Sequence, residues 1–220
     1  MGKWPILDKI EMIDGPIDEK TYEHDLEKLQ HRLLDLQTYH MRTGGRVIIG
    51  IDGWDAAGKG GLIERIEGLC SVDAWKRAYR EINEFERELT DDGVRIVKIL
   101  VHISAEEQKR RMIDRLNKPH KHYKIGLEDF RNIAKRKEYL EAYDDMLERT
   151  DTDDAPWHVV ASDNKLHARL TGLRIVADEI GKGVEITQPP LDPKIVEAAF
   201  KLWGWKPDNG KNDKKNGKKK

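Results

Sequence analysis

One short stretch of the sequence carries the residue types needed to hold phosphate. Residues 53–59, GWDAAGK, fit the pattern G-x-x-x-x-G-K and directly follow the apolar run RVIIGID of residues 46–52. In such a loop, small residues let backbone N–H groups surround phosphate oxygens at the start of a helix, and the lysine adds a mobile positive charge. The stretch therefore predicts a phosphate-binding loop; the alternative is a glycine-rich turn with an exposed lysine. The residues expected to contact phosphate are Gly53, Ala56, Ala57, Gly58, Lys59, Gly60 and Gly61.

The residue after the loop lysine departs from the usual pattern. Most loops of this kind place a serine or threonine there to help hold Mg²⁺, whereas this chain has Gly60. Mg²⁺ prefers oxygen ligands and commonly binds one or two carboxylates together with several waters. Asp55 inside the loop is therefore the expected ligand, and Asp52 at the strand end is a weaker candidate. The alternative for Asp55 is a turn-forming aspartate.

Strand and helix patterns alternate around this loop. The short β-branched run 46–52 suits a strand buried on both faces, and residues 94–104 and 157–162 have the same character. Helical periodicity is found in residues 22–40, 62–69, 72–89, 105–116, 127–149 and 165–180. This order predicts an α/β fold with a parallel sheet flanked by helices on both faces.

Composition and length restrict the organisation of the chain. Its 220 residues suit one folded domain, expected over residues 22–205 with an N-terminal extension, 1–21. Residues 206–220 are rich in lysine and predict a disordered tail. With 40 basic and 41 acidic residues, the near-zero net charge argues against specific nucleic-acid binding. No signal peptide or membrane-spanning run is found, so we expect a cytoplasmic protein.

The sequence around and beyond the loop resembles the polyphosphate kinase 2 family. The resemblance is carried in the family's order by residues 51–63 (IDGWDAAGKGGLI), 75–93, 97–115, 118–130 (KPHKHYKIGLEDF) and 139–170. It implies a phosphate-loop kinase fold similar to thymidylate kinase. It also implies Mg²⁺-dependent phosphoryl transfer between inorganic polyphosphate and a nucleoside mono- or diphosphate, and a homo-oligomer. Lys59 and the loop glycines would hold the exchanged phosphates, and Asp55 would bind Mg²⁺.

The same resemblance implies a lid at about residues 105–128. Its basic residues would close over the phosphates, because this reaction depends mainly on positioning and charge neutralisation. The matching candidates are Arg111, Arg115, Lys118, Lys121 and Lys124. With Lys59 and Asp55, Arg111 and Arg115 are the expected catalytic residues; for Lys118 and Lys121 the alternative is a solvated surface charge.

Directly after the loop, the sequence departs from the family pattern. The family has a long segment there, which ends in an Asp-Arg-Ser-Trp-Tyr motif that supplies a magnesium carboxylate and a catalytic arginine. This motif is absent here. Residues 61–66 (GLIERI) continue the loop helix, whereas the overlapping residues 63–71 (IERIEGLCS) resemble the segment just after the missing motif. We therefore predict a junction at Leu62–Ile66, about three remaining strands, and an exposed edge at RVIIGID. Activity would be weak or lost unless Asp52 or a partner subunit substitutes.

Two other functions fit the same residues. A phosphate-loop kinase that uses ATP and another small acceptor has the same loop, because the loop does not identify the donor. A non-catalytic binder of polyphosphate or another polyanion would need only the lid cations and the lysine tail.

Overall fold

The computed structural model describes residues 7–13, 15–54, 71–187 and 190–207. Phosphate-loop residues 55–61, the expected junction at Leu62–Ile66 and most of the lysine-rich tail lie outside these ranges. The chain forms two compact units, Met1–Val184 and Glu185–Lys220. The candidate site belongs to the first unit.

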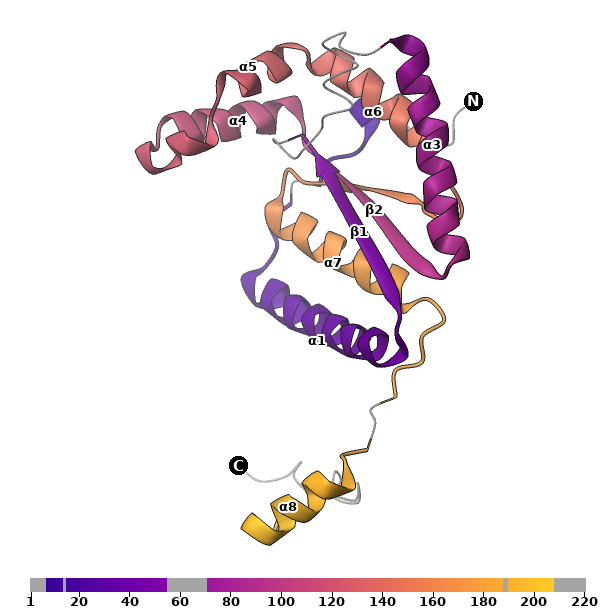
Figure 1. Ribbon diagram of the computed structural model, residues 1–220. Coiled ribbons are helices and arrows are strands. Elements are labelled where there is room, and N and C mark those ends of the chain that lie inside the picture. Colours follow the sequence, from indigo (N-terminus) through magenta and orange to yellow (C-terminus); the bar gives the residue numbers. More distant parts are fainter. Residues whose placement is uncertain (1–6, 14, 55–70, 188–189, 208–220) are drawn as a thin grey trace. The chain divides into compact units, whose positions relative to one another are not determined.

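In the first unit, the described residues form a three-stranded parallel sheet (Figure 1). Its strands are β1 (Arg46–Gly53), β2 (Val94–His102) and β3 (Trp157–Ala161), in the order β1-β2-β3. Gly50 is paired with Lys98, which is paired on its other side with Trp157. The parallel α/β fold and the three strands expected from the sequence are confirmed.

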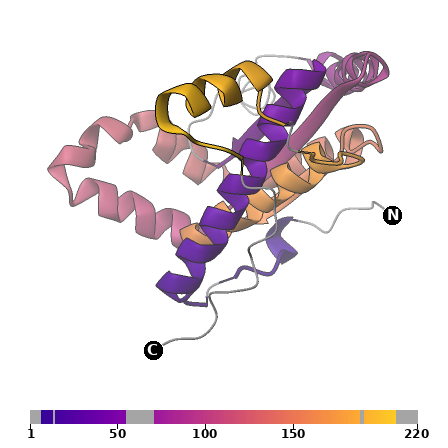
Figure 2. The same cartoon turned by 90° about the horizontal axis from the view of Figure 1, so that it is seen from below.

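Helices cover both faces of the sheet (Figures 1 and 2). On one face, Val97 and Ile99 of β2 pack with Leu36 of α1 (Glu19–Thr43) and Ala177 of α7 (Lys165–Gly181). On the other face, Leu100 packs with α6 (Arg136–Thr150) and with Leu7 of the short helix η1 (Leu7–Lys9). The helix α3 (Val72–Asp91) also contacts β2 and α6. The central strand β2 is therefore buried on both faces, which explains why most of its residues are apolar, with Arg95, Lys98 and His102 as the exceptions.

For the strand β1, the sequence predicts both burial on its two faces and an exposed sheet edge. It is hydrogen-bonded to β2 alone, so it forms an edge of the described sheet. The expectation that residues 46–52 are buried on both faces is wrong, because Ile48, Ile49 and Ile51 are 45%, 44% and 63% exposed. The predicted exposed edge is confirmed.

The segment that the resemblance implies as a lid lies between β2 and α6. It contains α4 (Ala105–Leu116), the 3₁₀ helix η2 (Pro119–Lys124) and α5 (Leu127–Ala134). Ser104 caps α4, because its hydroxyl accepts a hydrogen bond from the Glu107 backbone at 3.1 Å. The single helix expected over residues 127–149 is wrong, since the chain changes direction at Lys135 and forms α5 and α6.

The second unit contains α8 (Pro193–Trp203), capped by Asp192 at its start and by Gly204 in a left-handed conformation at its end. Phe200, Leu202 and Trp203 on this helix are exposed. None of the described helices is long and apolar enough to cross a membrane.

Candidate functional site

The site begins where β1 ends beside β2. Gly53 is paired with Val101, so the phosphate loop starts at the carboxyl edge of the sheet, next to the last residues of β2. A Cβ atom at Gly53 would lie 2.8 Å from the Val101 carbonyl oxygen, too close for any other side chain without a shift. Glycine is therefore required by the close approach of the two backbones.

Trp54 holds the first residues of the loop against the sheet. Its indole Nε1 donates a hydrogen bond to Nδ1 of His102 at 2.7 Å, and its ring lies 5.3 Å from that of Tyr143. The buried Tyr143 hydroxyl donates to the Gly53 carbonyl oxygen at 3.1 Å. These contacts fix the backbone at the entrance of the loop from two sides.

The protonation states of this cluster follow from its burial. Burial, with a contribution from the charge of Arg136, lowers the pKa of His102 from 6.5 to about 4. His102 is therefore neutral near pH 7, and its Nδ1 can accept the Trp54 hydrogen bond. Burial, followed by the negative charge of Asp52, raises the pKa of Tyr143, which keeps its hydroxyl available as a donor.

Arg136, at the start of α6, joins this cluster to the lid. Its guanidinium carbon lies 4.0 Å from the centre of the Trp54 ring, a cation–π distance. The same group donates hydrogen bonds to Gln108 Oε1 on α4 at 2.7 Å and to the Ile103 carbonyl at 2.6 Å. The entrance of the loop, the first turn of the lid helix and α6 are thus connected through one side chain.

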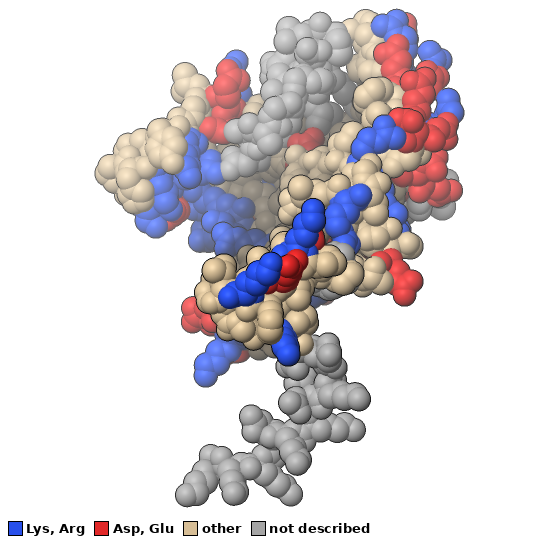
Figure 3. Space-filling model, turned by 60° about the horizontal axis from the view of Figure 1, so that its bottom comes forward, with Lys and Arg blue, Asp and Glu red and all other residues tan. Residues whose placement is uncertain are grey.

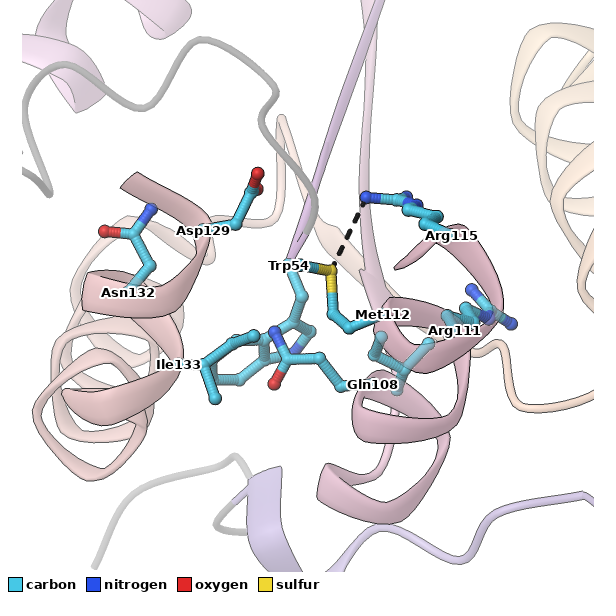
Figure 4. A pocket seen from close by; sticks show the side chains of 9 residues that line it. Trp54, Gln108, Arg111, Met112, Arg115, Asp129, Asn132 and Ile133 are labelled. Atoms are coloured by element: carbon cyan, nitrogen blue, oxygen red, sulfur yellow. Dashed lines mark hydrogen bonds between the residues drawn. The ribbon is translucent and has the colours of Figure 1, made fainter. Parts of the chain in front are cut away.

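A pocket lies between α4 and α5, with Trp54 at its base (Figure 4). Arg115 of α4 lies across the opening from Asp129 and Asn132 of α5. Arg111 lines this pocket and also a neighbouring one that contains Asp52 and Gly53. The structure thus brings both predicted lid arginines to the entrance of the phosphate loop.

Arg111 is held by its own helix and by the chain before α7. Its side chain is 20% exposed; it donates to Glu107 Oε1 at 2.6 Å and to the Ser162 carbonyl at 2.5 Å. Glu107 also accepts two hydrogen bonds from Arg110. These bonds, those from Arg110 first, lower the pKa of Glu107 despite its burial.

The predicted lid lysines lie farther along the segment. Lys118 and Lys121 both bind Asp114, each at 2.6 Å, and lower the pKa of that partly exposed carboxyl group to about 2. Lys124 places its ammonium group 5.4 Å from the Tyr123 ring, and its carbonyl accepts a hydrogen bond from Arg115. None of the three lines the pocket at Trp54. Figure 3 shows Lys and Arg side chains gathered on the side of the molecule where Figure 1 places α4 and α5.

The two candidate magnesium ligands differ in what the structure describes. Asp55 lies outside the described residues. Asp52 is partly buried at the end of β1, and its Oδ1 accepts a hydrogen bond from the Gly53 backbone at 2.6 Å. A carboxylate beside the phosphate loop has the donor chemistry that Mg²⁺ prefers, so Asp52 fits this ion. Among the described residues there is no cluster of three or more histidine, cysteine, aspartate or glutamate side chains suited to a metal.

Sequence reasoning did not identify His102, Arg136 and Tyr143. One signal pointed to His102, because a polar residue at the end of a central strand lies at the same edge as the end of β1. The other two side chains arrive from α6 through tertiary packing. No local pattern distinguishes them from ordinary helix residues.

The chain matches a known protein family over most of its length. The model of the family Polyphosphate kinase 2 (PPK2) matches residues 16–67 and 62–187. A polyphosphate:AMP phosphotransferase of Pseudomonas syringae pv. tomato is 43% identical over 121 residues, which are 55% of this chain and 24% of that protein. The chain thus spans about a quarter of that relative's length. A GDP-polyphosphate phosphotransferase of Pseudomonas aeruginosa is 31% identical over 240 residues, covering 82% of this chain and 67% of that protein.

Solved structures show the same similarity. The crystal structure of Polyphosphate Kinase 2 from Arthrobacter aurescens TC1 superimposes with a TM-score of 0.74 at 25% identity. The match covers 91% of this chain and 94% of that one. The structural similarity therefore extends over nearly the whole chain.

The comparisons also locate a missing segment. Residues 62–67 are matched twice by the family model, at the end of one region and at the start of the next. The alignment with the Pseudomonas aeruginosa protein spans 240 positions but covers 82% of these 220 residues, so about 60 of its positions have no counterpart here. Both findings agree with the predicted junction at Leu62–Ile66. With matches on both sides of this junction, the chain belongs to the polyphosphate kinase 2 family.

Proposed function

We propose that this protein transfers a phosphoryl group between inorganic polyphosphate and a nucleoside mono- or diphosphate. The observation that carries the proposal is the position of Arg111 and Arg115 beside Gly53 and Trp54, at the entrance of a phosphate-loop sequence. An oxygen of the nucleotide's terminal phosphate would attack the terminal phosphorus of polyphosphate. The phosphoanhydride bond breaks, and polyphosphate leaves as an anion shorter by one phosphate.

The residues of this chain would act mainly through charge and position. Lys59 and the loop backbone would hold the exchanged phosphates, while Arg111 and Arg115 would neutralise charge that develops on the transferred group. Mg²⁺ held by Asp55, with Asp52 as a second candidate, would supply further positive charge at the phosphates. Lys118, Lys121 and Lys124 would bind the more distant phosphates of the chain.

The missing segment predicts a slow enzyme. Removal of one preorganised charge-stabilising group commonly lowers the rate by roughly a hundred- to a thousandfold. About 60 positions present in a relative have no counterpart here, and the family model matches residues 62–67 twice. This shortfall favours a second candidate function, a polyphosphate-binding protein that has lost catalysis. The family comparisons give no support to an ATP-dependent kinase for another small acceptor.

The proposal is tested by ATP formation from long-chain polyphosphate, Mg²⁺ and ADP, with AMP as acceptor in parallel. We expect slow turnover that depends on polyphosphate and is abolished in Lys59→Ala. Equal ATP formation by wild type and Lys59→Ala would contradict catalysis. If the folded wild type nevertheless binds polyphosphate, the second candidate function is supported. A cytoplasmic location and a homo-oligomer belong to the same proposal.

A further inference from the structure

The first turn of α7 brings another cation to the lid. Lys165 follows Asn164, whose side chain caps α7 by accepting hydrogen bonds from the backbones of Leu166 and His167. The residues just before this cap are tied to α4: Arg111 donates to the Ser162 carbonyl, and the Ser104 backbone donates to Asp163 Oδ1 at 2.9 Å. The start of α7 is therefore held next to the start of the lid helix.

Lys165 lies in an excess of positive charge. Burial of part of its side chain lowers its pKa, and the charges of Arg111, Arg110 and Lys121 lower it further, while Glu107 acts in the opposite direction. Glu107 already accepts three hydrogen bonds from Arg110 and Arg111, and Lys121 is paired with Asp114. Among the described residues, the Lys165 ammonium group has no hydrogen-bond or ion-pair partner. An anion placed here would relieve repulsion that the protein's own carboxylates leave uncompensated.

The position of Arg111 connects Lys165 to the phosphate loop. Arg111 lines the pocket that contains Asp52 and Gly53, and it also binds the Ser162 carbonyl three residues before Lys165. Arg111 thus lies beside the end of β1 on one side and the chain before α7 on the other, so a phosphate chain that passes Gly53 and Arg111 can extend towards Lys165. A nucleoside diphosphate has two phosphates, whereas inorganic polyphosphate is long enough to occupy such a line of cations.

We infer that Lys165 is a polyphosphate-binding residue, which extends the anion-binding surface from the lid onto α7. This inference rests on the proposed function and adds a residue that the lid resemblance does not include. Its ligand is the polyphosphate chain and not the nucleotide.

The test measures binding of long-chain polyphosphate to the full chain by titration calorimetry, at two salt concentrations. We expect Lys165→Ala to weaken affinity roughly three- to tenfold, to reduce the salt dependence by about one released counterion, and to leave ADP affinity unchanged. Lys165→Arg should keep most of the affinity, and Lys165→Glu should lose more than Lys165→Ala. The matched control is Arg174→Ala, an exposed cation on the same helix about 13 Å away along its axis, which should bind as wild type does.

The outcomes separate this inference from the proposed function. If wild type binds polyphosphate and Lys165→Ala binds it with the same affinity, the role of Lys165 is overturned and the proposed function stays intact. A loss of ADP affinity with polyphosphate affinity unchanged also overturns it, because Lys165 would then belong to a nucleotide site. Wild type that does not bind polyphosphate overturns both. Because Lys165 is exposed, we expect each variant to fold as wild type does, and circular dichroism checks this.

Discussion

At the scale of single residues, the entrance of the phosphate loop depends on a neutral histidine. Trp54 is the last described residue at the start of the loop, and its indole is oriented by a hydrogen bond to His102 that a protonated imidazole cannot accept. The stacking of Arg136 on the same ring places a permanent positive charge nearby. Burial and this charge both oppose protonation of His102.

His102 predicts a pH dependence of stability. Its pKa is about 4 in the folded protein and 6.5 in its ordinary state, so below pH 6.5 the unfolded chain takes up a proton that the folded chain does not. The contribution is fully present above pH 6.5 and is lost as the pH falls towards 4. We expect the free energy of unfolding to fall by about 2 kcal/mol between pH 7 and pH 5 from this residue. Urea unfolding at both pH values measures it.

His102→Gln is the control for this prediction. Glutamine has no charged form, so the variant should lose less stability than wild type over the same pH interval, even if it is less stable at pH 7. Parallel pH profiles for the two proteins would assign the acid sensitivity to other groups. His158, whose pKa is also lowered mainly by burial, is common to both and cancels in the difference.

A buried hydroxyl gives a second prediction at this scale. Tyr143→Phe removes the hydrogen bond to the Gly53 carbonyl and leaves that buried acceptor without the Tyr143 donor. We expect a loss of about 1 kcal/mol in the free energy of unfolding. Tyr123→Phe, at a side chain that is 80% exposed, should change it by less than about 0.5 kcal/mol. Equal effects of the two substitutions would mean that the Gly53 contact contributes nothing.

At the scale of elements, a buried ion pair attaches α3 to the sheet. Lys98 of β2 binds Glu86 of α3 at 2.6 Å, and the two side chains are 7% and 13% exposed. The Lys98 ammonium group also donates to the Thr150 carbonyl and lies 5.2 Å from the Trp157 ring. Burial lowers the pKa of Lys98, against the opposing effect of Glu86. One charge in the central strand thus connects α3, α6 and β3.

Breaking this pair should be costly. Lys98→Met leaves Glu86 without its cation, and we expect a loss of about 3 kcal/mol in the free energy of unfolding. The double substitution with Glu86→Leu should recover most of it, because no buried charge remains. Arg87→Met, which breaks an exposed pair on the same helix, should cost less than about 1 kcal/mol. A double variant no more stable than Lys98→Met would contradict this account.

The two glycines of β1 provide a matched pair. Gly53→Ala would place a methyl group 2.8 Å from the Val101 carbonyl, whereas a methyl group at Gly50 meets nothing within 4 Å. We expect Gly53→Ala to destabilise the protein by about 1–3 kcal/mol and Gly50→Ala to be within about 0.5 kcal/mol of wild type. Thermal unfolding of both variants checks this. Equal effects would show that the two backbones can separate easily.

Elements were predictable where the signal is local. The apolar run of β2, the serine cap of α4 and the glycines after α1 each follow from side-chain chemistry within a few residues. The break between α5 and α6 at Lys135 could not be predicted, because no glycine or proline lies there. The next residue, Arg136, forms long-range hydrogen bonds to Ile103 and Gln108. The same difference applies to the site. The loop and the lid cations follow from sequence, whereas the Trp54 cluster and Lys165 depend on which segments the fold brings together.

At the scale of the whole molecule, the first unit has an open sheet edge. Backbone groups of β1 that face away from β2 have no strand partner among the described residues, and the isoleucines along this strand are exposed. On α3, Ile82 and Phe85 are also 42% and 62% exposed. Exposed apolar edges favour association with other chains.

This predicts self-association that a charge can weaken. Wild type should form larger species as its concentration rises in sedimentation velocity, and Ile49→Lys should lower the fraction of these species several-fold, because a lysine on an edge strand opposes pairing. Lys194→Glu in the second unit is a charge control with no expected effect. Concentration-independent, monomeric wild type would exclude association through this edge.

The position of the phosphate loop after β1 has a consequence for heat sensitivity. A strand with neighbours on one side can detach by losing half as many inter-strand hydrogen bonds as a central strand, so β1 should exchange its amide hydrogens faster than β2. Such local opening would release the loop entrance while α1, α7 and the rest of the sheet stay folded. Phosphate binding should therefore be lost several degrees below the temperature at which the molecule as a whole unfolds.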